Sequence, residues 1–159
     1  MVELDDIYNS KLMKLAATIP HTGHLSQPDA SGEAHSKLCG SAVSVEININ
    51  NGRVTDFAQN VKACLLGQAT ASIVGQHIIG TSLEEVHSLS EQMRRMLKEN
   101  GPPPTGRWSE LNLLAPVRDY KHRQPSTLLI FDALERAIYN YSLKLKASPE
   151  QKETRSLRE

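Results

Sequence analysis

The sequence predicts an α+β fold in which a three-stranded antiparallel sheet packs against helices. Residues 42–50 alternate apolar and polar side chains and run into Asn51-Gly52, a pattern that indicates a strand entering a tight hairpin. Residues 4–18 and 127–145 instead repeat their apolar side chains at helical spacing, which indicates helices with one buried face. A chain of 159 residues is long enough for one such domain with its own core.

The first helix is predicted over residues 4–18, because Pro20 and Gly23 end its helical spacing. Residues 21–35 are rich in Gly, Ser, Pro, Asp and His, which is the composition of a loop. We therefore expect this segment to carry the chain, without regular structure, to Cys39 and the strand that follows.

The sheet is predicted as a meander of short strands that begins with residues 42–50. Two further short strands are indicated by the apolar side chains Val54 and Phe57, and then Val61, Ala63 and Leu65. Cys64 is expected near the end of the third strand, directly before a helix that Gly80 ends. The positive end of that helix would lie near the sulfur and favour its thiolate form.

Two further helices complete the predicted domain. Thr81 and Glu84 have the spacing of a capping box, so a helix is expected from there to about Glu99, where residues 100–104 break it. The last helix is predicted over residues 127–145, with Ser126 as its N-cap. The domain should span residues 1–146, and the polar residues 147–159 are predicted to be a disordered tail.

Composition narrows the class of function. Lys and Arg number 18 against 18 Asp and Glu, so the chain lacks the basic excess that non-specific nucleic-acid binding requires. The acidic start and the absence of a long apolar run predict neither a signal segment nor a membrane span. We expect a soluble cytoplasmic protein with no nucleic-acid or membrane partner.

Cys39 and Cys64 are the candidate functional residues. Both flank predicted strand ends beside glycine turns, where a sulfur would be exposed. In a reducing compartment such cysteines more often remain thiols, bind metal or do redox work than form a permanent disulfide. Their separation in the sequence matches no zinc-finger spacing. The alternative is that both are small buried hydrophobic residues.

The order of these motifs resembles the NifU/IscU family of iron-sulfur cluster assembly scaffolds. The motifs that carry the resemblance are Leu38-Cys39-Gly40, Asn51-Gly52, Lys62-Ala63-Cys64, Gly80-Thr81-Ser82-Leu83-Glu84-Glu85 and the helix Leu128 to Ile138. The longer segment after Cys64 is similar to the SufU branch, with Leu114-Ala115 and Arg123 at matching places. The resemblance implies the NifU/IscU-like fold over most of the chain.

The resemblance also implies a site of three cysteines and an aspartate at one end of the sheet, which holds a nascent cluster or zinc and accepts sulfur from a cysteine desulfurase. Here the positions of the aspartate and the third cysteine carry Ser41 and Ser126. A serine hydroxyl keeps its proton and binds iron or zinc poorly. Cys39 and Cys64 alone do not complete the four ligands that a cluster normally takes.

Several groups are candidates to complete that site. A second subunit in a homodimer could share the cluster, His35 or His122 could coordinate, or glutathione and water could fill the open positions. Arg123 is expected near the metal or in a surface salt bridge. Ser41 and Ser126 are expected to cap a strand end and a helix, and the lone histidines to be solvent-facing or buried without metal.

The leading hypothesis is a diverged scaffold or accessory protein, not an enzyme, that accepts sulfur and binds iron or zinc through Cys39 and Cys64. Its cargo would be a transient iron-sulfur cluster or zinc, and its partners a cysteine desulfurase and cluster-accepting proteins. One alternative is a metal-free adaptor that binds these partners. Another is a zinc-dependent sulfurtransferase of the SufU kind.

Overall fold

The computed structural model describes residues 9–37 and 40–147. Its three-stranded antiparallel sheet has the order β1 (Ala30–His35), β2 (Ala42–Asn50) and β3 (Arg53–Lys62). The helices are α2 (Ser10–Ala17), α3 (Leu65–His77), α4 (Leu83–Lys98) and α5 (Gln124–Ala147), and 3-10 segments cover Gly106–Asp119 and Lys121–Arg123. The predicted α+β class, with an antiparallel three-stranded sheet against helices, is confirmed.

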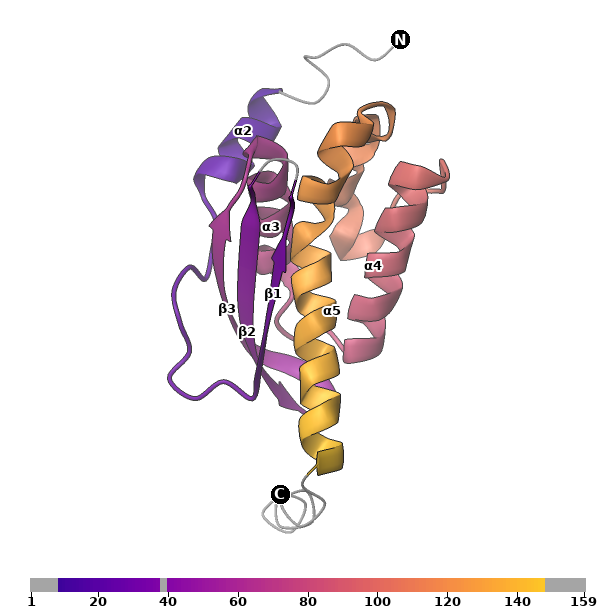
Figure 1. Cartoon of the computed structure of the whole chain (residues 1–159). Helices are drawn as coiled ribbons and strands as arrows, with labels where there is room; N and C mark the ends of the chain where they lie inside the picture. Colours follow the sequence, from indigo (N-terminus) through magenta and orange to yellow (C-terminus); the bar gives the residue numbers. More distant parts are fainter. Residues whose placement is uncertain (1–8, 38–39, 148–159) are drawn as a thin grey trace.

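Alternation along β2 creates the apolar face of the sheet. Val43, Val45 and Ile47 are buried, whereas the residues between them are only half-buried. α5 runs beside β1 and contacts β1 and β2, while α3 packs against α2, α5 and β3 (Figure 1). One continuous core results, with Phe131 of α5 and Ile47 of β2 among its fully buried side chains.

The structure corrects the prediction that residues 21–35 are a loop, because residues 30–35 form β1. The sequence pattern does not predict this strand because its inward residues, Ala30, Gly32 and Ala34, are small. Gly32 must be small because α5 lies close: a Cβ there would be 2.2 Å from the carbonyl oxygen of Ala133. Small side chains give no apolar alternation in the sequence.

The two short strands predicted after the hairpin are wrong: one strand, β3, contains Val54, Phe57 and Val61, whereas Leu65 begins α3. Its pattern is interrupted by Gln59, a fully buried polar residue whose amide donates to the carbonyls of Pro20 and Ala71 at 3.0 and 3.1 Å. A register shift at Asn48/Ile49 further disturbs the period of two.

Two predicted helix caps are also wrong. α4 is capped by Ser82, which accepts the N–H of Glu85 at 3.1 Å, whereas the Thr81 hydroxyl donates to the carbonyl of His77. α5 begins at Gln124, so Ser126 lies inside its first turn and is not its N-cap. The start of the first helix and the tail, residues 1–8 and 148–159, lie outside the described residues.

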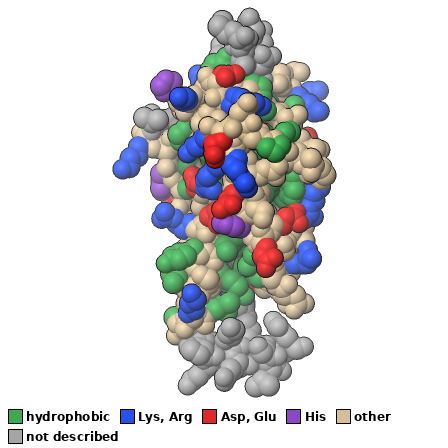
Figure 2. All heavy atoms as spheres, turned by 90° about the vertical axis from the view of Figure 1, so that its right-hand side faces the viewer, with side chains coloured by type: hydrophobic (Ala, Val, Ile, Leu, Met, Phe, Trp, Pro, Cys, Tyr) green, Lys and Arg blue, Asp and Glu red, His purple; other side chains and the backbone are tan. Residues whose placement is uncertain are grey.

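α5 continues to Ala147, one residue past the predicted domain boundary. In the described part of the chain, no helix is both long enough and apolar enough to cross a membrane. Figure 2 shows the face of the molecule on the α4 side, where side chains of both charges are interspersed and apolar side chains gather lower down.

Candidate functional site

Cys64 lies where the sheet meets the helices. It follows β3 and is the N-cap residue of α3, with its carbonyl accepting the N–H of Gln68 at 2.9 Å. Its side chain is half-buried and makes no capping hydrogen bond. The thiol is therefore free to contact neighbouring elements at the first turn of α3.

Two serines from distant parts of the sequence complete a small cluster with this thiol. The Sγ atom of Cys64 lies 3.1 Å from Oγ of Ser126, and that oxygen lies 3.4 Å from Oγ of Ser41. Ser126 is 2% exposed and Ser41 is 4% exposed, so both hydroxyls are buried. The sequence-predicted positions Ser41, Cys64 and Ser126 thus come together, and we call them the thiol-hydroxyl cluster.

Gly67 allows this close approach and was not singled out from the sequence. A Cβ at Gly67 would lie 3.0 Å from both the carbonyl and the hydroxyl oxygen of Ser126, and 2.8 Å from Cβ of Ala63. Any side chain there would push the first turns of α3 and α5 apart. The signal in the sequence was a glycine one turn after Cys64, at the head of a run of small residues.

A short turn leads from β1 into the cluster. Ser36 donates its N–H to the carbonyl of Ser41 at 2.8 Å and accepts the N–H of Gly40 at 3.0 Å. Gly40 has a φ of 71°, in the left-handed region that glycine enters without strain. Cys39 belongs to this segment but lies outside the described residues, so its predicted role stays a prediction.

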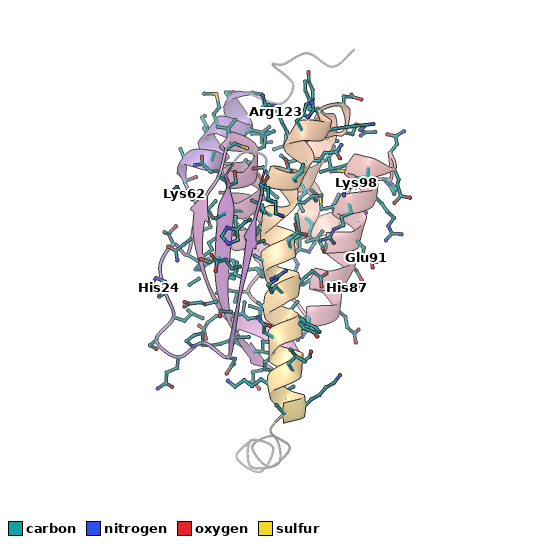
Figure 3. The ribbon with its side chains drawn as sticks, in the orientation of Figure 1. His24, Lys62, His87, Glu91, Lys98 and Arg123 are labelled. Carbon is teal, nitrogen blue, oxygen red and sulfur yellow. The ribbon has the colours of Figure 1, made fainter. Side chains whose placement is uncertain are left out.

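Of the other residues proposed from the sequence, His35 ends β1, and His122 and Arg123 lie in the 3-10 segment that precedes α5. His35 is exposed, and its Nε2 pairs with Oε1 of Glu33 at 3.1 Å. His122 is exposed in the segment before α5. Arg123 is half-buried at the start of α5, near the same end of the molecule as Lys62 at the end of β3 (Figure 3).

The donor chemistry of the thiol-hydroxyl cluster is that of one soft ligand. A thiolate binds iron and zinc well, whereas neutral hydroxyls are poor ligands for both. Residues 9–37 and 40–147 contain no group of three or more His, Cys, Asp or Glu placed to hold a metal ion. The described residues alone therefore do not fit a closed zinc or cluster site, and they present one free, half-buried thiol.

The resolved pKa shifts lie on other parts of the surface. Hydrogen bonds from Trp108 and Arg107 lower the pKa of Glu85, and a hydrogen bond with His24 lowers the pKa of Glu46. A hydrogen bond with Glu135 raises the pKa of His87. These groups stabilise helix and loop contacts and do not belong to the cluster.

Two curated relatives match most of the chain. The iron-sulfur cluster assembly scaffold protein IscU of Thermotoga maritima is 25% identical over 137 residues, which is 86% of this chain and 95% of the relative. The protein of the same name from Streptococcus pyogenes serotype M1 is 24% identical over 136 residues, covering 86% and 85%.

Solved structures agree in fold. A nitrogen-fixing NifU-like protein (N-terminal) from Brucella abortus has a TM-score of 0.87 and 47% identity, covering 89% of this chain and 98% of that one. The FiSufU protein of Fervidobacterium islandicum AW-1 has a TM-score of 0.76, covers 85% and 98%, and at 19% identity shows the fold alone. The NifU-like N terminal domain family matches residues 7–148. Because that match takes in every described helix and strand, the chain belongs to the NifU-like N terminal domain family.

Proposed function

We propose that this chain is an iron-sulfur cluster assembly protein, a diverged scaffold or accessory that accepts sulfur and binds iron or zinc through Cys39 and Cys64. Two IscU scaffold relatives match it over most of their length, which supports the role. The observation that carries the proposal is the half-buried thiol of Cys64 beside the hydroxyl of Ser126, where sheet, α3 and α5 meet.

Sulfur acceptance needs only groups of this chain and a donor persulfide. The thiolate of Cys64 attacks the terminal sulfur of a cysteine persulfide on a desulfurase, and a new S–S bond forms on Cys64 as the donor's S–S bond breaks. The donor cysteine leaves as a thiolate, and the proton lost by Cys64 is available to it. No external oxidant or reductant is consumed, because the sulfane sulfur moves between two thiols.

Iron and cluster enter the proposal as cargo. Since the described donor set does not fit a closed metal site, no step of the transfer is assigned to bound zinc. Cys39 supplies the second thiol of the proposed site. Further ligands would come from a second subunit, from His35 or His122, or from glutathione and water, and Arg123 would be the basic group near the metal.

The proposed partners are a cysteine desulfurase and cluster-accepting proteins, in the cytoplasm. The role is that of a scaffold or accessory and not of an enzyme, since the cargo is taken up and passed on without turnover of a substrate. Thiol reactivity requires that the desulfurase reach Cys64, and the half-buried position of that side chain agrees with this requirement.

The test is reconstitution of the full chain without oxygen, with ferrous iron, cysteine and a cysteine desulfurase. We expect cluster absorbance with matching iron and acid-labile sulfide, and loss of both in the double variant Cys39→Ala, Cys64→Ala. The variant Ser88→Ala, which changes an exposed hydroxyl of α4, is the matched control. Equal sulfide content in the double variant would contradict the proposal.

A metal-free adaptor is the second candidate. The observation that favours it is the single thiol among the described cluster residues. An adaptor should bind the desulfurase equally well with both cysteines replaced, whereas a scaffold should lose its sulfide-dependent output. A zinc-dependent sulfurtransferase has the least support, because the FiSufU likeness is one of fold alone.

A further inference from the structure

The hydroxyl of Ser126 makes no hydrogen bond to its own helix within the described residues. The next residue, Thr127, shows the usual arrangement for a buried hydroxyl in a helix, because it donates to the carbonyl of Arg123 at 2.8 Å. Ser126 instead directs its hydroxyl away from α5, towards Cys64 and Ser41. The contact with the thiol is therefore not a by-product of helix geometry.

Among the described residues, this hydroxyl is the polar partner of the Cys64 sulfur. As the N-cap residue of α3, Cys64 could turn its side chain towards the N–H groups of that helix, but it makes no capping hydrogen bond. Its Sγ lies 3.1 Å from Oγ of Ser126, which is 2% exposed. The buried hydroxyl is thus shielded from water and aimed at the sulfur.

A charged sulfur would orient the hydroxyls of the cluster. A neutral thiol can donate to an oxygen or accept from it, whereas a negatively charged sulfur can only accept. Beside a charged sulfur Ser126 must therefore donate, and its oxygen can then accept the hydroxyl of Ser41, which lies 3.4 Å away. Hydrogen bonds to charged acceptors are the stronger ones, and a second donor in line polarises the first. The two serines together stabilise an anionic sulfur held against Ser126.

A persulfide on Cys64 would bring such a sulfur to this place. In an ionised persulfide the negative charge lies on the terminal sulfur, which is about 2 Å from the inner one. Oγ of Ser126 is 3.1 Å from the inner sulfur, so a rotation of the Cys64 side chain can bring the terminal sulfur within the same reach of the hydroxyl. The hydrogen bond would then pass from the inner sulfur to the sulfur that carries the charge.

We propose that Ser126 is a positioning residue that holds the transferred sulfur on Cys64, with Ser41 behind it as the second donor. The inference rests on the proposed function, because it requires Cys64 to carry sulfur. Transfer from a donor exchanges one thiol persulfide for another, so its equilibrium constant is near one unless one side is stabilised. A hydroxyl that donates to the terminal sulfur on this chain shifts the equilibrium towards the chain.

The test is the equilibrium of sulfur exchange with glutathione, at one pH and without oxygen. The parent protein is the full chain with Cys39→Ala, in which Cys64 is the remaining thiol. The Cys64 thiol attacks the terminal sulfur of glutathione persulfide, an S–S bond forms on Cys64 as the S–S bond of the donor breaks, and glutathione leaves with the proton. Mass spectrometry of the protein at several ratios of glutathione to its persulfide gives the equilibrium constant.

Three variants of this parent make the test specific. Ser126→Ala should lower the equilibrium constant about ten-fold, the effect of losing a hydrogen bond to a charged group. Ser41→Ala should lower it about two-fold, because it removes only the second donor. Thr127→Val deletes the neighbouring buried hydroxyl, which bonds to main chain and not to the cluster, and should leave the constant unchanged. The ultraviolet absorption of the persulfide should also shift in Ser126→Ala and not in Thr127→Val, since only the first loses a donor to the sulfur.

Equal constants for Ser126→Ala and the parent would overturn the role of Ser126, while sulfur uptake by Cys64 and the proposed function would stand. Equal losses in Ser126→Ala and Thr127→Val would also overturn it, because the effect would then come from the packing of α5. If the parent takes up no sulfur on Cys64, this inference and the sulfur-accepting step of the proposed function fail together.

Discussion

At the scale of single residues, the chemistry of the site depends on Ser126. Its hydroxyl lies 3.1 Å from the sulfur of Cys64 and 3.4 Å from the hydroxyl of Ser41, so it is the central member of the thiol-hydroxyl cluster. A sulfur at this position would convert one soft ligand into two neighbouring ones. With serine at position 126, the described cluster therefore has one soft ligand for a metal ion, where cysteine would give it two.

Ser126→Cys is expected to form a disulfide with Cys64 on mild oxidation, because a small rotation closes the present 3.1 Å separation to a covalent bond. Thiol titration should then find two fewer free thiols than in the reduced variant. Ser88→Cys, on the exposed face of α4, is the control and should keep its thiol. Retention of both thiols in Ser126→Cys would mean that the two side chains do not face each other in solution.

Gly67→Ala is expected to destabilise the protein despite the better helix propensity of alanine. The new Cβ would lie within 3.0 Å of backbone and side-chain atoms of Ser126 and Ala63. Overpacking of this kind costs about 1–3 kcal/mol, whereas the gain in propensity is about 1 kcal/mol. Urea unfolding measures the net loss, with Gln68→Ala on the same turn as control; greater stability of the Gly67 variant would contradict the close approach.

The sequence could indicate which residues meet at the site but not where each one lies in its helix. Ser41, Cys64 and Ser126 occupy family motif positions in the sequence, and the fold brings them together. The role of Ser126 as an N-cap was wrong, since α5 begins two residues earlier at Gln124. Helix starts depend on tertiary contacts, and Gln124 is held by donating its side-chain amide to the carbonyl of Leu97 at 3.0 Å.

At the scale of secondary-structure elements, α5 packs directly against Gly32 of β1. Gly32→Ala would place a Cβ 2.2 Å from the carbonyl of Ala133 and 2.4 Å from the nitrogen of Ala137, both backbone atoms that cannot turn aside. We expect a loss of about 3 kcal/mol in the free energy of unfolding, at the upper end for overpacking. Urea denaturation measures it, and Ser31→Ala on the exposed side of the same strand should be close to neutral.

Whether an element could be predicted depended on the periodicity of its apolar side chains. The hairpin of β2 and the amphipathic helices α4 and α5 follow from periodic apolar side chains, and they appear where expected. β1 has no such period, because its inward side chains are small and Gly32 lies directly against α5. β3 was divided in two by Gln59, whose buried amide bonds to the carbonyls of Pro20 and Ala71, contacts that no local pattern reveals.

His87 links α4 to α5 in a way that should depend on pH. Its Nδ1 lies 2.8 Å from Glu135 and its Nε2 lies 3.3 Å from Glu91 (labelled with His87 in Figure 3). The hydrogen bond with Glu135, followed by the charges of Glu135 and Glu91, raises the pKa of His87 above its ordinary value of 6.5, against a small opposing effect of burial and of Arg94. A raised pKa in the folded state stabilises the fold below that ordinary value, and this contribution is lost as pH rises through the raised pKa.

His87→Gln should therefore lower stability at about pH 5.5 and have little effect at about pH 8.5, on either side of histidine titration. Urea unfolding of both proteins at the two pH values measures the difference. Ser88→Ala, which removes an exposed hydroxyl with no titratable group from the same helix, should show no such dependence. A deficit in His87→Gln that is the same at both pH values would indicate loss of packing and not of charge.

At the scale of the whole molecule, stability comes from the hydrophobic core and not from the candidate site. The core runs from Leu12 of α2 through β2 and β3 to Phe131 of α5, with these side chains almost fully buried. Cys64 of the thiol-hydroxyl cluster packs against this core and is itself only half-buried. Small domains that depend on a metal for folding, by contrast, lack a core of this extent.

Removing metal should consequently leave the full chain folded. We expect protein treated with a chelator to keep its near-ultraviolet circular dichroism and its cooperative thermal transition. Added zinc or ferrous iron should raise the Tm only in proportion to binding of the folded state, since a ligand stabilises by RT ln(1 + [L]/Kd). That rise should vanish in Cys39→Ala, Cys64→Ala, while the Tm of the metal-free variant stays near that of the metal-free wild type.

Metal that is part of the folded structure and metal that is bound as cargo can be told apart, because the first controls cooperative unfolding and the second changes only the Tm. Loss of cooperative unfolding on chelation would mean that metal is part of the folded structure, contrary to the extent of the core. A metal-dependent rise in Tm that survives in the double cysteine variant would place the binding groups elsewhere on the chain. A protein that carries metal as cargo must release it without unfolding. We therefore expect a chain that folds without metal and whose metal-dependent rise in Tm requires the cysteines.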